Sequence, residues 1–306
     1  MNGVDFFQTF SPTPKMTTLR VLLHVAAQRD YELHSLDFST AFLQGNLHDE
    51  IRLRRPPGFT GTNLAALGFA PSTADPSLFL RTDTTLPPFY VPVYVDDLVF
   101  ATADTEALAQ VKSELQKRHT CTDLGPAALW VHVILATVHS SAYRSLALNS
   151  TFGRVPRYVA PGRHRKEHMD AAKSELHYLC STSGMVLVLG GRARFVLTGH
   201  ADASWADDLT TQRSSQGYTF SLVSGYVSWR STRSSSVLSS SCGAEIYAGA
   251  MAAQGLRWLT YLLTDMGEPP RSPPMLYVDN KAMIALCEEH KQEHRTKHIA
   301  LRYFLA

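Results

Sequence analysis

Two adjacent carboxylates, Asp96 and Asp97, stand between two runs of β-branched and aromatic residues in the segment YVDDLVFA. A tight hairpin would present both side chains at the end of a sheet, and Asp37, near the end of an earlier strand-like run, could add a third carboxylate. Oxygen ligands of this kind suit a hard cation such as Mg²⁺. Two such ions about 3.5–4 Å apart support phosphoryl transfer, so the pattern predicts a two-metal site.

A plain turn is the alternative for this hairpin. Asp-Asp pairs are common in turns, where their side chains bond the local backbone. At average residue usage, a Tyr-x-Asp-Asp string has roughly a few per cent chance of arising in a chain of this length. The hairpin alone therefore suggests the metal site without deciding it.

The hydrophobic pattern predicts the elements that must position these residues. Apolar residues at helical spacing predict helices over 14–28, 104–119, 169–181 and 244–263. Extended patterns predict strands at 31–37, 86–100, 194–205 and 275–280, and a hairpin over 217–229 with its turn at Ser224 and Gly225. Pro92 lacks a backbone donor, which favours an edge position for its strand.

Length and composition indicate a globular protein of about two domains. The chain has 306 residues, of which 44% are hydrophobic and 18% charged. Strands followed by interleaved helices indicate an α+β or α/β domain that begins near Gly190, with a boundary within 150–190. Four dispersed cysteines without CxxC spacing argue against a zinc site and a disulfide framework.

Charge and hydropathy bear on partners and location. The net charge is only +2, but basic residues gather in three groups, at 52–55, 162–168 and 291–298. Each group could follow a phosphate backbone or could equally be solvated surface. The sequence has no apolar run of the ~18 residues that a membrane span needs and no signal-peptide layout at its start, which predicts an intracellular protein of cytoplasm or nucleus with no membrane partner.

Longer segments resemble a known family in their order. LHSLDFSTAFLQGNLHDEIRLRRPPGF, the segment FFQTFSPTPKMTTLRVLLHVAAQ before it, and the segments LGFAPSTADPSLF and YVDDLVFATAD after it resemble the reverse transcriptase of copia-type retrotransposon Pol polyproteins. The resemblance implies that Asp37, Asp96 and Asp97 are the catalytic, metal-binding triad. It also places Phe42 where the family keeps an aromatic side chain at the nucleotide site that excludes the 2′-hydroxyl of a ribonucleotide.

The last third resembles the ribonuclease H domain that follows the polymerase in these polyproteins. The matching segments are TGHADASWADD, SSSCGAEIYAGAMAA, LYVDNKAMIAL and HRTKHIALRYF. The resemblance implies that Asp202, Glu245 and Asp279 are catalytic ligands of Mg²⁺ or Mn²⁺, which would activate water against an RNA phosphodiester.

Plain structural roles are open for the same acidic residues. Asp279 could cap a helix that starts at Asn280, and Glu245 in a first helical turn would be favoured by the helix dipole. Asp207 and Asp208, in the same segment as Asp202, are expected to be turn residues.

Three departures from the family limit what the resemblance implies. A segment containing a Leu-Tyr-Gly-Leu-Lys-Gln run is absent near Asn63, which would remove a helix and one wall of the nucleotide site. Ala300 stands where the family keeps a fourth ribonuclease H carboxylate. The stretch 146–163 joins two segments that are far apart in the family.

The sequence thus predicts an α/β fold in three parts: a truncated α+β palm and fingers region at 1–145, a shortened connection at 146–190 and a ribonuclease H-like α/β domain at 191–306. The expected partners are nucleic acids, namely an RNA template, a DNA primer and an RNA–DNA hybrid. Polymerisation is expected to be lost, and hybrid cleavage weak or absent. The alternatives are a non-catalytic nucleic-acid-binding remnant and a chain that does not fold well.

Overall fold

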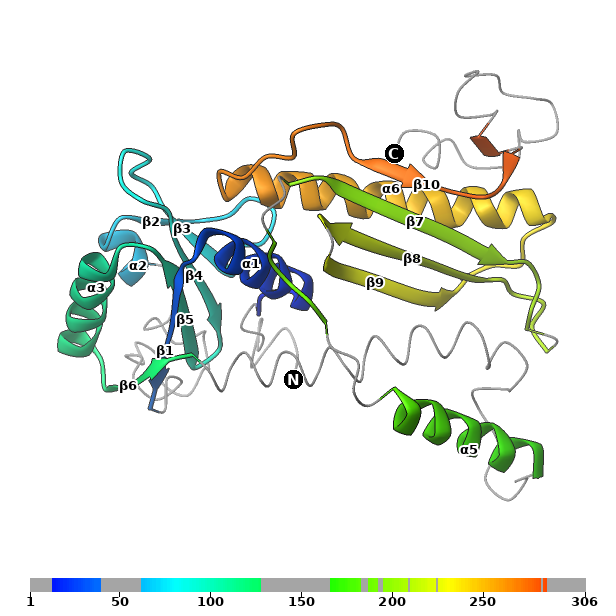
Figure 1. The fold of residues 1–306 in the computed structure, drawn as a ribbon, viewed down its shortest axis with the longest axis horizontal. Helices are drawn as coiled ribbons and strands as arrows, with labels where there is room; N and C mark the ends of the chain where they lie inside the picture. Colours follow the sequence, from blue (N-terminus) through cyan, green and yellow to red (C-terminus); the bar gives the residue numbers. More distant parts are fainter. Residues whose placement is uncertain are drawn as a thin grey trace, which may run out of the picture. The chain divides into compact units, whose positions relative to one another are not determined.

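A computed structural model describes residues 13–39, 62–127, 166–182, 187–191, 195–208, 210–223, 225–281 and 283–284. The chain divides into two compact units (Figure 1). Unit 1 contains residues 1–133, 189–193 and 259–270, and unit 2 contains residues 134–188, 194–258 and 271–306. Both units mix helices and sheets, as predicted. Each unit is described by itself.

Unit 1 is built on a sheet with the strand order β2-β3-β4-β5-β1-β6, in which every described pair is antiparallel. Its strands are β1 Glu32–Phe38, β2 Phe69–Pro71, β3 Leu78–Arg81, β4 Phe89–Tyr94, β5 Asp97–Thr102 and β6 Cys121–Pro126. The hairpin of β4 and β5 therefore lies inside the sheet, with β1 directly beside β5.

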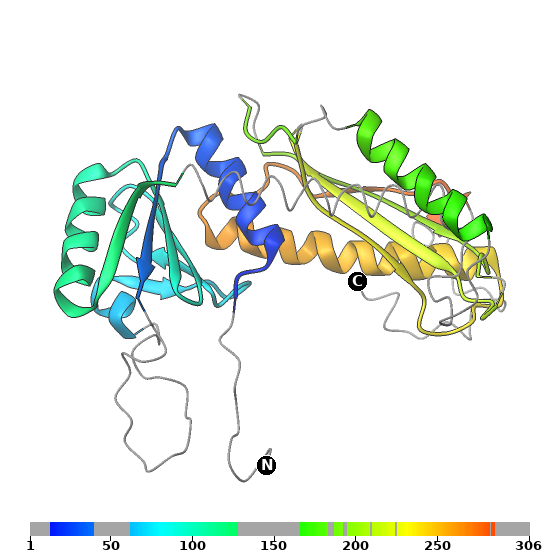
Figure 2. The same ribbon diagram turned by 90° about the horizontal axis from the view of Figure 1, so that it is seen from below.

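Helices cover both faces of this sheet. They are α1 Met16–Arg29, α2 Thr62–Ala66 and α3 Thr105–Arg118. The helices α1 and α3 lie on opposite sides of the sheet (Figures 1 and 2). The predicted cap of α3 is confirmed, because the Asp104 carboxylate accepts a hydrogen bond from the Ala107 N–H at 3.0 Å.

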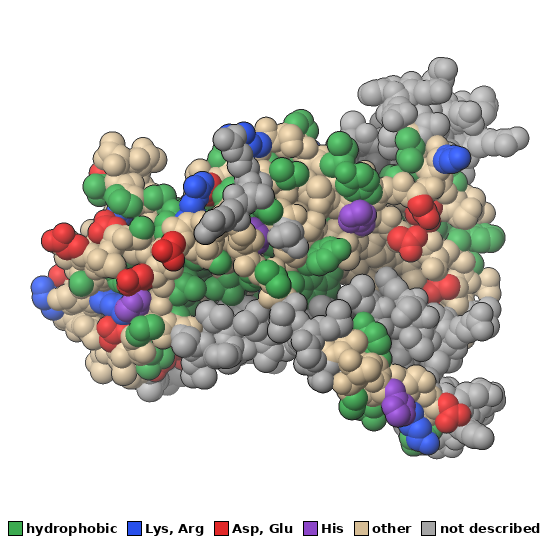
Figure 3. All heavy atoms as spheres, in the orientation of Figure 1, with side chains coloured by type: hydrophobic (Ala, Val, Ile, Leu, Met, Phe, Trp, Pro, Cys, Tyr) green, Lys and Arg blue, Asp and Glu red, His purple; other side chains and the backbone are tan. Residues whose placement is uncertain are grey.

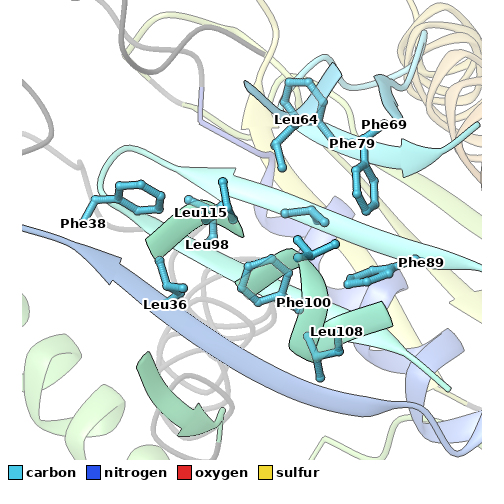
Figure 4. Packing of buried hydrophobic residues seen from close by; sticks show 12 residues of the cluster. Leu36, Phe38, Leu64, Phe69, Phe79, Phe89, Leu98, Phe100, Leu108 and Leu115 are labelled. Atoms are coloured by element: carbon cyan, nitrogen blue, oxygen red, sulfur yellow. The ribbon is translucent and has the colours of Figure 1, made fainter. Parts of the chain in front are cut away.

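The core under α3 holds the β4–β5 hairpin in place. Phe89 and Phe100 are fully buried, and their rings meet edge to face with centroids 6.1 Å apart. Leu108 and Leu115 of α3 pack in the same cluster as Leu36 of β1 (Figure 4). Burial of these alternating apolar positions leaves Asp37, Asp96 and Asp97 at the ends of well-anchored strands.

Unit 1 also contains a segment from late in the chain, residues 259–270. The Tyr90 hydroxyl donates to the Met266 carbonyl at 2.7 Å. The Arg29 guanidinium donates to both carboxylate oxygens of Glu268, at 2.7 and 2.6 Å. The sequence did not predict these contacts. The predicted boundaries at 145 and 190 stay a prediction.

Unit 2 contains a second sheet, with the strand order β10-β7-β8-β9. Its elements are α5 Lys166–Ser181, β7 Leu197–Ser204, β8 Ser215–Leu222, β9 Gly225–Arg233 and β10 Met275–Tyr277. The strand β10 runs parallel to β7, while the other pairs are antiparallel. The long helix α6, Ser241–Asp265, lies along one face of this sheet over its unit 2 residues (Figure 2).

Two glycines allow α6 to approach the sheet closely. A Cβ added at Gly255 of α6 would lie 2.6 Å from the ring of Phe220, and one added at Gly199 of β7 would lie 3.0 Å from both Phe220 and Leu256. Phe220 is itself only 1% exposed, so its ring cannot move aside into solvent. The close approach fixes how α6 sits on the strand that carries Asp202.

The structure corrects the expectation for Pro92 and adds elements. The strand β4 lies between β3 and β5, so Pro92 is not at an edge. Val91 and Pro92 of β4 have no paired residue on β5. The hydrogen-bond ladder between the two strands is therefore interrupted where proline has no N–H to donate. The short elements α2, β2 and β3 were not predicted, because they offer too few residues for a periodic pattern. The strand β6 was missed because its sequence, CTDLGP, contains Asp, Gly and Pro, which are depleted in strands. Among the described residues, no helix is long and apolar enough to span a membrane.

We predict that two glycine-to-alanine changes in α6 differ in their effect on the free energy of unfolding. Alanine favours a helix over glycine by about 1 kcal/mol, but at Gly255 the new methyl group meets Phe220, and overpacking costs roughly 1–3 kcal/mol. Gly255→Ala should therefore lower the free energy of unfolding by about 1 kcal/mol. Gly243→Ala, whose Cβ would meet only Ser240 Oγ at 3.3 Å, is the matched control and should cause no loss. Equal effects in urea denaturation would contradict this packing.

Candidate metal centre

The hairpin of unit 1 places its two aspartates at a strained turn. Tyr94 pairs with Asp97, so Val95 and Asp96 form a two-residue loop. Val95 has a φ of +53°, and a positive φ at the first loop residue is a feature of the turns favoured in two-residue hairpins. A β-branched residue is uncommon there, and such backbone strain costs of order 1–3 kcal/mol.

Register brings Asp37 next to this turn. Asp37 of β1 lies directly opposite Asp97 of β5. Side chains at such positions have Cβ atoms about 4.5–5.5 Å apart, and like charges there destabilise a sheet. Burial raises the pKa of Asp97, and the negative charges of Asp37 and Asp96 raise it further. Asp96 Oδ1 is buried and has no hydrogen-bond partner among the described residues.

The predicted triad is thus gathered at one end of the sheet but does not form a tight cluster. In the described part of the chain, the one group of three or more candidate ligands whose atoms all lie within 4.8 Å of one another belongs to unit 2. Phe42, Ala300, and most or all of each predicted basic group lie outside the described residues.

The tight cluster of unit 2 consists of Asp202, Glu245 and Asp279, with one ligand atom from each lying within 4.8 Å of the others. Strand register explains two of them. Tyr277 of β10 is paired with His200 of β7, and the two strands run parallel. Asp279 and Asp202 each follow that pair by two residues, so they emerge side by side. Figure 3 shows acidic side chains over this part of β7 and β10.

Glu245 joins the cluster from α6 and is its buried member, with 7% exposure. The Ala203 N–H donates a hydrogen bond to its carboxylate, while Oε2 is buried without a partner among the described residues. Burial, followed by the negative charges of Asp202 and Asp279, raises the pKa of Glu245 to about 7. An unpartnered buried carboxylate oxygen that faces two more carboxylates fits a cation site better than a structural role.

The local geometry excludes the purely structural roles considered for Glu245 and Asp279, namely stabilisation by the helix dipole and capping of a helix. The helix α6 begins at Ser241, so Glu245 lies beyond its first turn, and the expected dipole effect does not apply. Asn280, and not Asp279, caps the following helical residues, because its Oδ1 accepts from the Met283 N–H at 2.9 Å.

The neighbouring acids behave as turn residues, as predicted. Asp208 accepts hydrogen bonds from Thr210, Thr211 and Arg233. Asp207 accepts from the backbone and hydroxyl of Ser215. Sequence reasoning missed the contribution of the Ala203 N–H, for which the sequence carries no signal, since any residue there offers the same backbone group.

The donor set fits a hard divalent cation such as Mg²⁺ or Mn²⁺. Carboxylate oxygens are the ligands that these ions prefer. A cation would neutralise the repulsion within the cluster and would satisfy Glu245 Oε2, which has no hydrogen-bond donor among the described residues. Asp202 and Asp279 are exposed, so a bound ion could be reached from solvent.

We predict that affinity for Mn²⁺ rises with pH across the titration of Glu245. With a pKa of about 7, this carboxyl group is protonated at pH 6, and the ion must displace the proton. The apparent affinity should increase about tenfold from pH 6 to pH 8, as measured by calorimetry. Glu245→Gln should bind more weakly and lose most of this pH dependence. Equal affinity at both pH values in the unmodified chain would contradict the prediction.

Known proteins match this chain along most of its length. Residues 1–64 match the family model described as reverse transcriptase (RNA-dependent DNA polymerase). The retrovirus-related Pol polyprotein from transposon TNT 1-94 of Nicotiana tabacum is 28% identical over 398 aligned positions, which cover 98% of this chain and 30% of that protein. The corresponding polyprotein from transposon RE2 of Arabidopsis thaliana is 28% identical over 389 positions, covering 98% of this chain and 26% of the relative.

A solved foamy viral protease-reverse transcriptase in complex with dsDNA has a TM-score of 0.39 and 13% identity, with coverage of 90% of this chain and 66% of that chain. This similarity is too low to support an argument about fold or function.

The lengths of the alignments show that the relatives are longer than this chain within the matched region. Each alignment has more positions than the 306 residues of this chain, so the relatives contain residues within the matched region that have no counterpart here. The chain is thus similar, over almost its whole length, to retrovirus-related Pol polyproteins of plant transposons, and it spans less than a third of the length of these relatives.

Proposed function

We propose that unit 2 holds a divalent cation with Asp202, Glu245 and Asp279, and uses it to cleave the RNA strand of an RNA–DNA hybrid slowly. The observation that carries the proposal is that these three carboxylates lie within 4.8 Å of one another, together with the buried Glu245 Oε2, which has no hydrogen-bond partner in the described part of the chain. The resemblance of the surrounding segments to a ribonuclease H domain supports the choice of substrate.

The three side chains have different parts in this proposal. Asp202 and Asp279 are exposed, so a phosphodiester can approach them from solvent. Glu245 is buried on α6, where it accepts a hydrogen bond from the Ala203 N–H and lies with one ligand atom within 4.8 Å of those of Asp202 and Asp279. A bound divalent cation would supply an activated water and would stabilise the charge that develops on the phosphate.

Slow rather than efficient cleavage follows from the ligand count. Two-metal phosphodiester hydrolysis needs carboxylates for both ions. Ala300 replaces the fourth carboxylate that the family resemblance leads one to expect, so a second ion would lack a ligand.

For unit 1 we infer that polymerisation is lost. Asp37, Asp96 and Asp97 remain at the hairpin, but the segment expected to form one wall of the nucleotide pocket is missing from the sequence. Positioning of reactants can account for about 7–11 kcal/mol of barrier reduction, so metal ligands without a pocket should catalyse poorly.

A hybrid-cleavage assay tests the first proposal. With a labelled RNA–DNA hybrid and Mn²⁺, the unmodified chain should cut the RNA slowly, and Asp202→Asn should abolish cutting. Ala300→Asp should increase the rate by about tenfold or more, since it restores a ligand for the second ion. Asp170→Asn changes an exposed carboxylate of α5 and is the matched control, with no expected effect.

Two results of this assay would contradict the proposal. One is equal cleavage by the unmodified chain and Asp202→Asn. The other is an unchanged rate in Ala300→Asp. A third outcome would instead support the non-catalytic nucleic-acid-binding alternative. In that outcome, neither the unmodified chain nor Ala300→Asp cleaves the hybrid, but the unmodified chain binds it with an affinity that falls steeply as the salt concentration rises.

Primer extension tests the second proposal. On an RNA template with a DNA primer and Mg²⁺ or Mn²⁺, we expect no incorporation of nucleotides, because the aspartates lack a pocket to hold the substrate. Incorporation that disappears in Asp96→Asn would show that unit 1 is an active polymerase after all.

A further inference from the structure

The residues that follow Asp279 make a specific contact with α6. Asn280 caps the helical residues 281, 283 and 284. The side chain of Met283 reaches Gly249, where an added Cβ would overlap Met283 Cε and lie 3.1 Å from its Sδ. Met283 is only 7% exposed, so its thioether end occupies space that the missing side chain of Gly249 leaves open.

Both residues of this contact are close in sequence to members of the acidic cluster. Gly249 follows Glu245 by four residues on α6, and Met283 follows Asp279 by four residues. Residues four apart on a helix share a face, so Gly249 lies next to Glu245, whereas Asp279 precedes the helical residues that Asn280 caps and is joined to Met283 through them. The contact therefore ties the segment carrying Asp279 to the face of α6 that carries Glu245.

Among the described residues, few contacts other than this one hold Asp279 in place. The strand before it, β10, has only three residues and pairs with β7 alone among the described strands. The side chain of Asp279 is exposed, and it faces two other carboxylates that repel it. Without an anchor after residue 279, repulsion would favour a wider cluster.

We propose that Met283, packed on Gly249, is a positioning residue that holds Asp279 within ligand distance of Glu245 and Asp202. This inference rests on the proposed cation site. Glycine is unfavourable within a helix compared with alanine, and at position 249 that cost is offset by room for the methionine. Methionine suits the role because its flexible thioether fills an irregular gap.

The test is Mn²⁺ binding by the full chain, measured by calorimetry at pH 8, together with thermal unfolding without metal. Met283→Ala should weaken Mn²⁺ binding about tenfold or more, the range typical of residues that orient metal ligands. Met283→Leu keeps the volume and should restore affinity to within about threefold of the unmodified chain. Leu222→Ala removes a buried side chain of β8 at the end of the β7–β8 pair opposite to Asp202, and should lower the unfolding temperature without changing affinity.

The outcomes separate this inference from the proposed function. If the unmodified chain binds no Mn²⁺, or binds it as tightly as Glu245→Gln does, the proposed site itself fails. If Glu245 is required but Met283→Ala binds as tightly as the unmodified chain, the positioning role of Met283 is wrong. The role is also wrong if Leu222→Ala weakens binding as much as Met283→Ala.

A second variant covers the case in which Met283→Ala fails to fold. Gly249→Ala adds one methyl group to the same contact, while the flexible end of Met283 can shift and alanine favours the helix. It should fold and weaken Mn²⁺ binding several-fold. Unchanged affinity in a folded Gly249→Ala would overturn the proposal.

Discussion

The close packing of α6 on its sheet is the interaction on which the acidic cluster of unit 2 depends. Phe220 fills the space that Gly255 and Gly199 leave open, so the helix approaches β7 more closely than larger residues would permit. Glu245 precedes Gly255 by roughly 15 Å of helix, and Asp202 follows Gly199 by roughly 10 Å of strand. An apolar contact thus determines where two carboxylates meet, although neither carboxylate takes part in it.

Electrostatic repulsion opposes this arrangement. Three carboxylates crowd together, and the buried one keeps its proton up to a pH of about 7 because ionisation there is costly. Carboxylates also repel one another in unit 1, since Asp37 and Asp97 face each other across a strand pair. In both units the backbone holds acids together against their charges, and a divalent cation would relieve that repulsion.

Part of this arrangement could be predicted from the sequence. The helices α1, α3 and α6 and the strands β1, β7 and β8 have periodic patterns long enough to be recognised. Short strands such as β2 and β6 were missed, because their residues form strands only through pairing with neighbours. The inner position of β4 was also missed, because a break in its ladder accommodates Pro92, and local propensity does not report such a break.

The sequence by itself determined the acids, their order and the resemblance that links them to transposon Pol polyproteins. Only the tertiary structure decided which acids meet: the register of β10 on β7 aligns Asp279 with Asp202, and α6 brings in Glu245. Only the tertiary structure also decided that residues 259–270 pack with unit 1, through Tyr90 and Arg29. The physical reason is that side-chain type and spacing act locally along the chain, whereas register, close packing and burial arise between segments far apart in it.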